Sequence, residues 1–258
     1  MPTVGDLPVA AIDVTALHRL LQPLWATTPQ TGARLRGRIE NILDWAKVLN
    51  YRSGPNPAQW RGNLDKLPPR PSKVRRVQHL ASMPYAKVPA FMAQLQERGT
   101  AAAKTLQFTV LTAVRTNEAL GARWQEIDLD QKLWTIPPER MKAGVAHKVP
   151  LTKAALQILK SITPDQSGLV FVNSPGKPLS PTTMHRTMAL MRIKDATPHG
   201  FRSSFRTWAA ECTNFPREIA EAALAHANGD KVERAYQRSD HFRKRRELMD
   251  QWAQHCMA

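Results

Sequence analysis

The sequence is poor in cysteine and has no long apolar run. Its 258 residues include only Cys212 and Cys256, too few for a disulfide scaffold or a cysteine-type zinc site. No apolar stretch approaches the length of a membrane span, and the N-terminus lacks the basic-then-apolar pattern of a secretion signal. We therefore expect a cytoplasmic protein without a membrane partner.

Several catalytic motifs are also missing. Gly176-Lys177 is followed by Pro178 and lacks the upstream glycine of a phosphate-binding loop. The sequence contains no Gly-x-Gly-x-x-Gly, no His-Glu-x-x-His and no acidic cluster suited to two-metal phosphoryl transfer. We therefore expect no cofactor: if the chain cuts nucleic acid, it does so without metal or ATP, using its own cationic side chains.

Positive charge is the most pronounced property of the composition. Lysine and arginine number 37 against 21 aspartate and glutamate, giving a formal net charge of +16. Such a field attracts a polyanion. Nucleic acid is the first candidate and an anionic membrane surface the second, while a merely basic soluble protein is the plainest alternative. Hydrophobic residues at 42% indicate a folded chain.

Hydrophobic spacing predicts a mainly α fold with a small antiparallel three-stranded sheet (α+β). Asp13 is expected to cap a first helix, and apolar residues recur at helical spacing from Leu35 to Leu49, with Arg34 and Arg38 on the other face. The three β-type runs lie within residues 126–151. Further helices are expected at about 86–98, 101–113, 152–162, 180–192, 199–211, 216–225, 230–238 and 241–256.

A basic, proline-rich segment at residues 67–77 predicts a domain boundary. Its cationic side chains are Arg70, Lys73, Arg75 and Arg76. The segment is suited to following a phosphate backbone, although an ordinary solvated linker explains it equally well. We therefore divide the chain into a helical domain at 1–66, the linker at 67–77, and a larger domain at 78–258 that ends in the helix at 241–256.

Two arginines stand where an anion site would form. Arg115 ends an apolar helix, a costly position unless the guanidinium meets an anion, and Glu118 is the internal candidate. His199 and Arg202 lie three residues apart at a helix start and share one face. Taken alone, each of these features is more often an ordinary structural residue.

The order of the residues changes this interpretation. The motifs Arg115-Thr-x-Glu118, Leu120-Gly-Ala-Arg-Trp124, Met141-Lys142, His199-Gly-Phe-Arg202, Leu224-Ala-His226 and Glu233-Arg-Ala-Tyr236 follow one another along the chain. This series resembles the tyrosine recombinase, or phage integrase, family, and is most similar to integrases of prophages and genomic islands. The resemblance covers residues 78–258 well and the preceding helices less completely. It implies a catalytic domain preceded by a partial helical core-type DNA-binding domain.

The resemblance implies a site-specific recombinase that integrates or excises a DNA element. Tyr236 would attack a phosphodiester to leave a 3′-phosphotyrosine, with no metal or ATP. Arg115 and Arg202 would hold the non-bridging oxygens, and a phenol with a pKa near 10 would need such support to react. Lys142, on a turn between the last two β runs, would protonate the leaving hydroxyl, with Lys148 as the nearby rival.

The remaining roles come from the same resemblance. His199 matches a proton-handling position, His226 a hydrogen bond to the scissile phosphate, and Glu118 the acidic residue that orients the first arginine. The expected partners are double-stranded DNA attachment sites, a homotetramer on DNA, and DNA-bending and excision factors. The C-terminal helix would pack on a neighbouring protomer, although it is equally able to fold back on its own domain.

Two departures from the family pattern stand out. Asn117 replaces a glycine in the turn after Arg115, and asparagine tolerates a positive φ well. The chain also begins part-way into the second domain of such integrases, which predicts intact chemistry with an incomplete hold on DNA. Two other readings stay open: a DNA-binding regulator or remnant without recombination activity, and a type IB topoisomerase.

Overall fold

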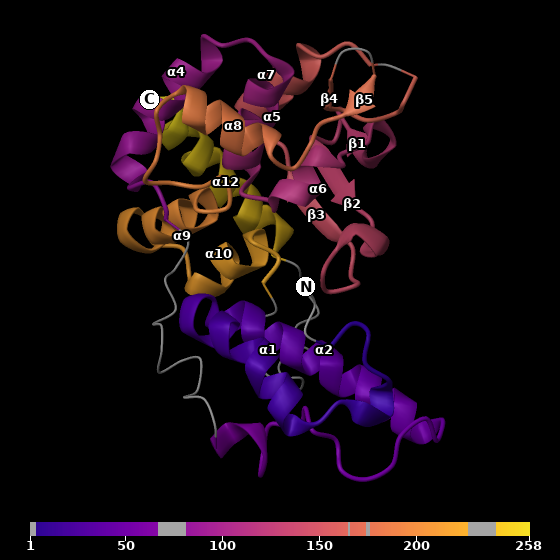
Figure 1. Cartoon of the computed structure of the whole chain (residues 1–258). Helices are drawn as coiled ribbons and strands as arrows, with labels where there is room; N and C mark the ends of the chain where they lie inside the picture. Colours follow the sequence, from indigo (N-terminus) through magenta and orange to yellow (C-terminus); the bar gives the residue numbers. More distant parts are fainter. Residues whose placement is uncertain (1–3, 67–80, 165, 174–175, 227–240) are drawn as a thin grey trace. The chain divides into compact units, whose positions relative to one another are not determined.

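The computed structural model describes residues 4–66, 81–164, 166–173, 176–226 and 241–258, and the chain divides into compact units at 1–79 and 80–258 (Figure 1). The expected helix at 230–238 and the basic linker lie outside the described residues. The mainly helical fold with a small antiparallel sheet is confirmed.

The first unit is built on two long helices, α1 (Val14–Thr27) and α2 (Pro29–Val48), with short 3-10 turns η1 (Val9–Ala11) and η2 (Leu64–Lys66). The Asp13 carboxylate accepts a hydrogen bond of 2.7 Å from the Ala16 amide and caps α1, as predicted. Trp25 stacks on Trp60 with ring centroids 5.9 Å apart, which fixes the segment after α2 against α1.

The apolar stripe predicted for α2 is only partly correct. Leu43 and Ala46 are buried, but Ile42 and Leu49 are 56% and 43% exposed. Arg34 and Arg38 are exposed on the same helix, as expected from the spacing.

The second unit packs its helices around α5. They are η3 (Tyr85–Lys87), α4 (Val88–Gln96), α5 (Ala101–Thr112), α6 (Thr116–Leu120), α7 (Lys153–Lys160), α8 (Thr183–Leu190), α9 (Phe201–Cys212), α10 (Arg217–Ala223) and α12 (Phe242–Cys256). Every residue of α5 from Thr105 to Thr112 is buried. A helix covered on all sides forms the centre of a core. Its C-terminal end is therefore held rigidly by packing, and Arg115 follows shortly after it.

The sheet has the order β1-β2-β3 and is antiparallel throughout: β1 is Ile127–Asp128, β2 Leu133–Ile136 and β3 His147–Pro150. Trp134 pairs with Val149, and both are buried. The 3-10 turn η4 (Trp124–Glu126) leads into β1, and η5 (Pro138–Arg140) follows β2. A second, two-stranded ladder of β4 (Val172–Asn173) and β5 (Lys177–Pro178) was not predicted.

Helix α12 packs within its own unit, which is the second of the two arrangements that the sequence left open. Leu248, Met249 and Trp252 lie on its buried face, as the spacing predicts. The Trp252 indole donates a 2.9 Å hydrogen bond to the Val110 carbonyl of α5, which satisfies its buried polar atom. The buried Arg245 guanidinium donates to the Lys148 carbonyl of β3 at 2.7 Å.

Candidate active site

Arg115 is held by the turn that ends α5. Ala113 closes the helix with a left-handed backbone (φ 52°), and Arg115 then caps α6. The Arg115 amide donates to Glu118 Oε2 at 2.8 Å, and its guanidinium Nη1 donates to Oε1 at 2.7 Å. Glu118 is only 4% exposed, so this pair offsets much of the cost of placing a cation at the end of a buried helix.

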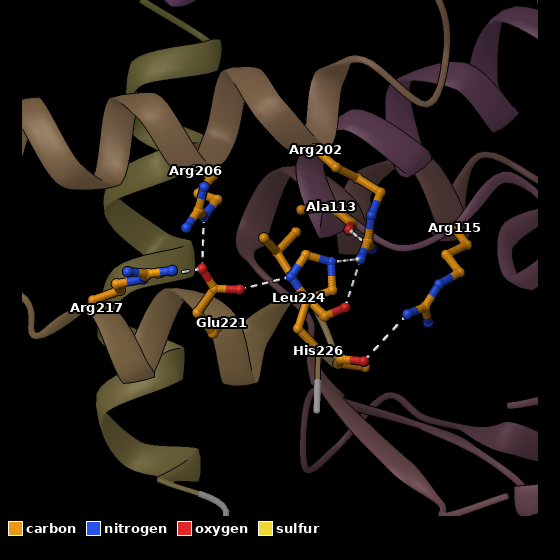
Figure 2. A network of polar contacts seen from close by, with 9 residues as sticks. Ala113, Arg115, Arg202, Arg206, Arg217, Glu221, Leu224 and His226 are labelled. Atoms are coloured by element: carbon orange, nitrogen blue, oxygen red, sulfur yellow. Dashed lines mark hydrogen bonds and ion pairs between the residues drawn. The ribbon is translucent and has the colours of Figure 1, made fainter. Parts of the chain in front are cut away.

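Arg202 is buried near the start of α9 and is held by backbone carbonyls. Its Nη1 donates to the Ala113 carbonyl at 2.5 Å and its Nη2 to the Leu224 carbonyl at 2.6 Å (Figure 2). Burial and the neighbouring charge of Arg115 lower the pKa of Arg202 to about 10, so it stays protonated at neutral pH. Among the described residues, no carboxylate forms an ion pair with this guanidinium.

The end of α10 brings the two arginines together. Arg115 Nη2 donates to the carbonyl of Ala225 at 3.2 Å, next to the Leu224 carbonyl that receives Arg202 (Figure 2). Helix carbonyls at a C-terminus have no partner within their own helix and carry partial negative charge, so they suit guanidinium donors. Two arginines from separate segments are thus fixed by adjacent carbonyls.

Gly200 sets the position of His199 and Arg202. A Cβ atom at Gly200 would lie 2.2 Å from the Ala81 carbonyl oxygen, so only glycine fits at this contact. His199 precedes it and is exposed. Partial burial of the ring and the charges of Arg202 and Arg115 lower the pKa of His199, which favours a neutral imidazole.

A surface cavity of about 480 Å³ joins Arg115, Glu118, Lys142 and His199. Lys142 lies on the turn between η5 and β3, and it is exposed. Arg140, which lines the same cavity, donates to the Glu118 carbonyl at 2.5 Å and pairs with Glu126. Cationic groups from two separate segments, with the imidazole of His199 from a third, therefore line one concave surface, an arrangement that suits a bound phosphate.

His226 follows α10 and lies between Arg202 and Glu221. Its Nε2 is 3.1 Å from Arg202 Nη2, and its Nδ1 is 2.6 Å from Glu221 Oε2 (Figure 2). The structure thus places Arg115, Glu118, Arg202 and His226 in one connected network, with His199 and Lys142 on the adjoining cavity.

Some predicted site residues are not placed here. Tyr236 and the linker residues Arg70, Lys73, Arg75 and Arg76 lie outside the described residues. Asn117 is helical, so the positive φ considered for it does not occur, and Ala113 carries the left-handed backbone instead.

Sequence reasoning missed Glu221 and the three carbonyl groups. The signal for Glu221 was an acidic residue five positions before a histidine at a helix end.

In the described ranges no group of three or more His, Cys, Asp or Glu could hold a metal ion. Nor does any helix among the described residues reach the length and apolarity needed to cross a membrane.

Fold and site together define a mainly helical domain in which two guanidinium groups are held by adjacent carbonyls, a geometry that suits an anionic ligand. Residues 82–243 match the profile of the phage integrase family, and residues 1–63 match the phage integrase central domain. The first match covers more than half of the chain, which therefore belongs to the phage integrase, or tyrosine recombinase, family.

Individual relatives agree with this assignment. Prophage integrase IntA of Escherichia coli K12 is 31% identical over 98% of this chain and 61% of its own length, and the integrase of Enterobacteria phage P4 is 28% identical over 95% and 57%. The chain thus spans about 60% of the length of these relatives. A lambda integrase dimer bound to a COC′ core site has a similar fold, with a TM-score of 0.63 and 16% identity over 93% of this chain and 68% of that one.

Proposed function

We propose that this chain is a tyrosine-type site-specific DNA recombinase, which integrates or excises a prophage or genomic island. The observation that carries the proposal is the pair of guanidinium groups anchored on the adjacent Leu224 and Ala225 carbonyls, beside a cavity lined by Lys142 and His199. A DNA substrate would place the protein in the cytoplasm, at the nucleoid. The lambda integrase tetramer bound to a Holliday junction, similar in fold with a TM-score of 0.60, supports a tetrameric assembly on DNA.

In this proposal the reaction exchanges one phosphodiester for another. The Tyr236 oxygen attacks phosphorus, the bond from phosphorus to the 5′ oxygen breaks, and a 3′-phosphotyrosine forms. Arg115 and Arg202 hold the non-bridging oxygens, where negative charge grows in the transition state. Because a free alkoxide leaves poorly, Lys142 gives its proton to the 5′ oxygen. Rejoining is the reverse step and needs no ATP.

The remaining residues prepare this site. Glu118 fixes the Arg115 fork through two hydrogen bonds, and His199 handles the tyrosine proton. His226 contacts the scissile phosphate. We also propose that residues 1–66 act as a partial core-type DNA-binding domain and that the linker at 67–77 follows the DNA backbone. Arg34 and Arg38 on α2, and Arg70, Lys73, Arg75 and Arg76 in the linker, would contact phosphates.

The test is covalent capture of DNA. Wild-type protein and Tyr236→Phe are incubated in EDTA, without ATP, with a nicked DNA duplex. This duplex carries the attachment core sequence found at the ends of the prophage or genomic island that encodes the protein. We expect a denaturation-resistant protein–DNA band from the wild type and none from Tyr236→Phe. Tyr51→Phe, an exposed tyrosine of the first unit, is the matched control and should keep the band.

The other outcomes separate the alternatives. Specific DNA binding without a band from the wild type would favour a regulator. Relaxation of supercoils with a covalent band but without recombinant products would favour a topoisomerase. Arg202→Lys keeps the charge but loses the fork, and we expect it to form the band about 100- to 1000-fold more slowly.

A further inference from the structure

Glu221 receives contacts from two arginines and one histidine on one carboxylate. Its Oε1 accepts from Arg206 Nε at 2.6 Å and lies 3.5 Å from Arg217 Nε, while its Oε2 contacts His226 Nδ1 at 2.6 Å (Figure 2). Glu221 is 8% exposed. Burial acts to raise the pKa of its carboxyl, but hydrogen bonds from His226 and Arg206 outweigh this, so the pKa lies below its usual value.

These contacts determine where the proton of His226 sits. An ionised carboxylate only accepts hydrogen bonds, so Nδ1 of His226 must carry a proton. A guanidinium only donates, and Arg202 Nη2 lies 3.1 Å from Nε2, so Nε2 must present its lone pair to Arg202. The geometry therefore favours a proton on Nδ1 and a lone pair on Nε2 of His226 in the protein without DNA.

We propose that Glu221 is a positioning residue: it fixes the proton of His226 on Nδ1 and thereby holds Nε2 as an acceptor for Arg202, which orients that guanidinium. This role rests on the proposed recombinase function. Glu221 itself touches neither arginine of the anion site, and it acts on Arg202 through His226. The imidazole of His226 is 42% exposed, so burial alone does not fix the orientation of its ring. The hydrogen bond to the Glu221 carboxylate supplies this restraint.

A purely structural role makes a different prediction. Glu221 lies on α10 and Arg206 on α9, so their pair could simply tie the two helices together. The two roles use different oxygens, since both arginines contact Oε1 and the histidine contacts Oε2. Removing Arg206 breaks the link between the helices and leaves the contact to His226, whereas changing Glu221 breaks both.

The experiment reads the tautomer directly in the full chain without DNA. Long-range ¹H–¹⁵N NMR spectra at neutral pH distinguish Nδ1–H from Nε2–H imidazoles, and the His226 signal is assigned by its loss in His226→Gln. We expect the Nδ1–H form in the wild type and in Arg206→Gln, and a shift toward Nε2–H in Glu221→Gln and Glu221→Ala. Glu247→Gln, which removes only an exposed ion pair on α12, should match the wild type.

The same variants are then tested on the nicked substrate. We expect Glu221→Gln to slow formation of the covalent band by about 10- to 100-fold, less than removal of a phosphate donor itself, with DNA affinity nearly unchanged. Arg206→Gln should stay within a few-fold of the wild type.

Several results would overturn the positioning role. These are an Nε2–H tautomer in the wild type, an unchanged tautomer in both Glu221 variants, or equal slowing by Arg206→Gln and Glu221→Gln. If the wild type shows the Nδ1–H tautomer but forms no covalent band, the proposed function fails while the assignment of the His226 proton stands. If the band forms and the tautomer is insensitive to Glu221, only the positioning role fails.

Discussion

At the scale of single residues, Arg115 and Arg202 are held largely by hydrogen bonds to backbone carbonyl oxygens. Ala113, Leu224 and Ala225 each offer a carbonyl to a guanidinium, and in the described part of the chain Glu118 is the only carboxylate that pairs with either arginine. Carbonyl groups fix the orientation of a guanidinium without neutralising its positive charge. The two guanidiniums therefore stay available for a phosphate, whereas a second ion pair would compete with it.

His147, at the start of β3, provides a test of the charge in this region. It is 9% exposed, and burial, followed by the charges of Arg245, Arg202 and Arg115, lowers its pKa to about 4, against a raising effect of the Ala223 carbonyl. The unfolded chain, with a histidine pKa near 6.5, binds more protons between these two values. Stability from this residue is therefore complete above about pH 6.5 and is lost as the pH falls toward 4.

We expect the wild type to lose about 2 kcal/mol more unfolding free energy than His147→Gln on going from about pH 7.5 to pH 5. Denaturant titrations at the two pH values measure this difference. His185→Gln, which changes an exposed histidine of α8, should keep the wild-type pH dependence. Parallel pH dependences for the wild type and His147→Gln would contradict the prediction.

The residues that carry reactive groups could be recognised from the sequence, but their anchors could not. Arginine, lysine and histidine in a fixed order point to phosphate chemistry because their side chains do that chemistry. Ala113, Leu224 and Ala225 act through their backbones, so their identities carry no signal. Glu221 lay within reach of prediction, yet its pairing with Arg206 depends on how α9 packs against α10.

At the scale of elements, the turn before α9 depends on one close backbone approach. In Gly200→Ala the added methyl would lie 2.2 Å from the Ala81 oxygen and 2.9 Å from the Ser82 Cα, so this backbone must move. We expect a loss of about 1–3 kcal/mol of unfolding free energy, measured by denaturant titration. Covalent capture should also fall, because His199 and Arg202 flank this residue.

A second glycine serves as the control. Gly37 lies inside α2 with no atom within 4 Å of an added Cβ, so Gly37→Ala should raise stability by about 0.5–1 kcal/mol through helix propensity. Equal unfolding midpoints for the two alanine variants would show that the contact at Gly200 is not restrictive.

Long, periodic elements were predictable, and the two strands of the second, smaller sheet were not. The apolar spacing identified α5, α9 and α12 because each buries a regular face or its whole circumference. Strands β4 and β5 have two residues each, too few to display an alternating pattern. The direction in which α12 packs is also not encoded in its own pattern, since an apolar face fits its own domain as well as a neighbour. The contact from Trp252 to Val110 decides it.

At the scale of the whole molecule, positive charge is spread over both units. Residues 1–79 hold 12 lysines and arginines against 5 aspartates and glutamates, and residues 80–258 hold 25 against 16. A reaction centre in the second unit alone would not need a basic first unit. We therefore expect the first unit to bind DNA phosphates through the exposed Arg34 and Arg38 of α2, while Arg36 of the same helix is paired with Glu40 and the Ala58 carbonyl.

Salt dependence measures this contribution without requiring catalysis. Each phosphate contact adds about 0.9 to the slope of log affinity against log salt concentration, so replacing Arg34 and Arg38 with serine should lower the slope by about 2 on duplex DNA. Lys153→Ser with Lys160→Ser, on α7, removes the same net charge from exposed positions without a proposed DNA contact. Distant charges are screened over about 10 Å at 0.1 M salt, so this control should leave the slope nearly unchanged. If both double variants lower the slope equally, the loss reflects net charge alone, and α2 is not the surface that contacts DNA.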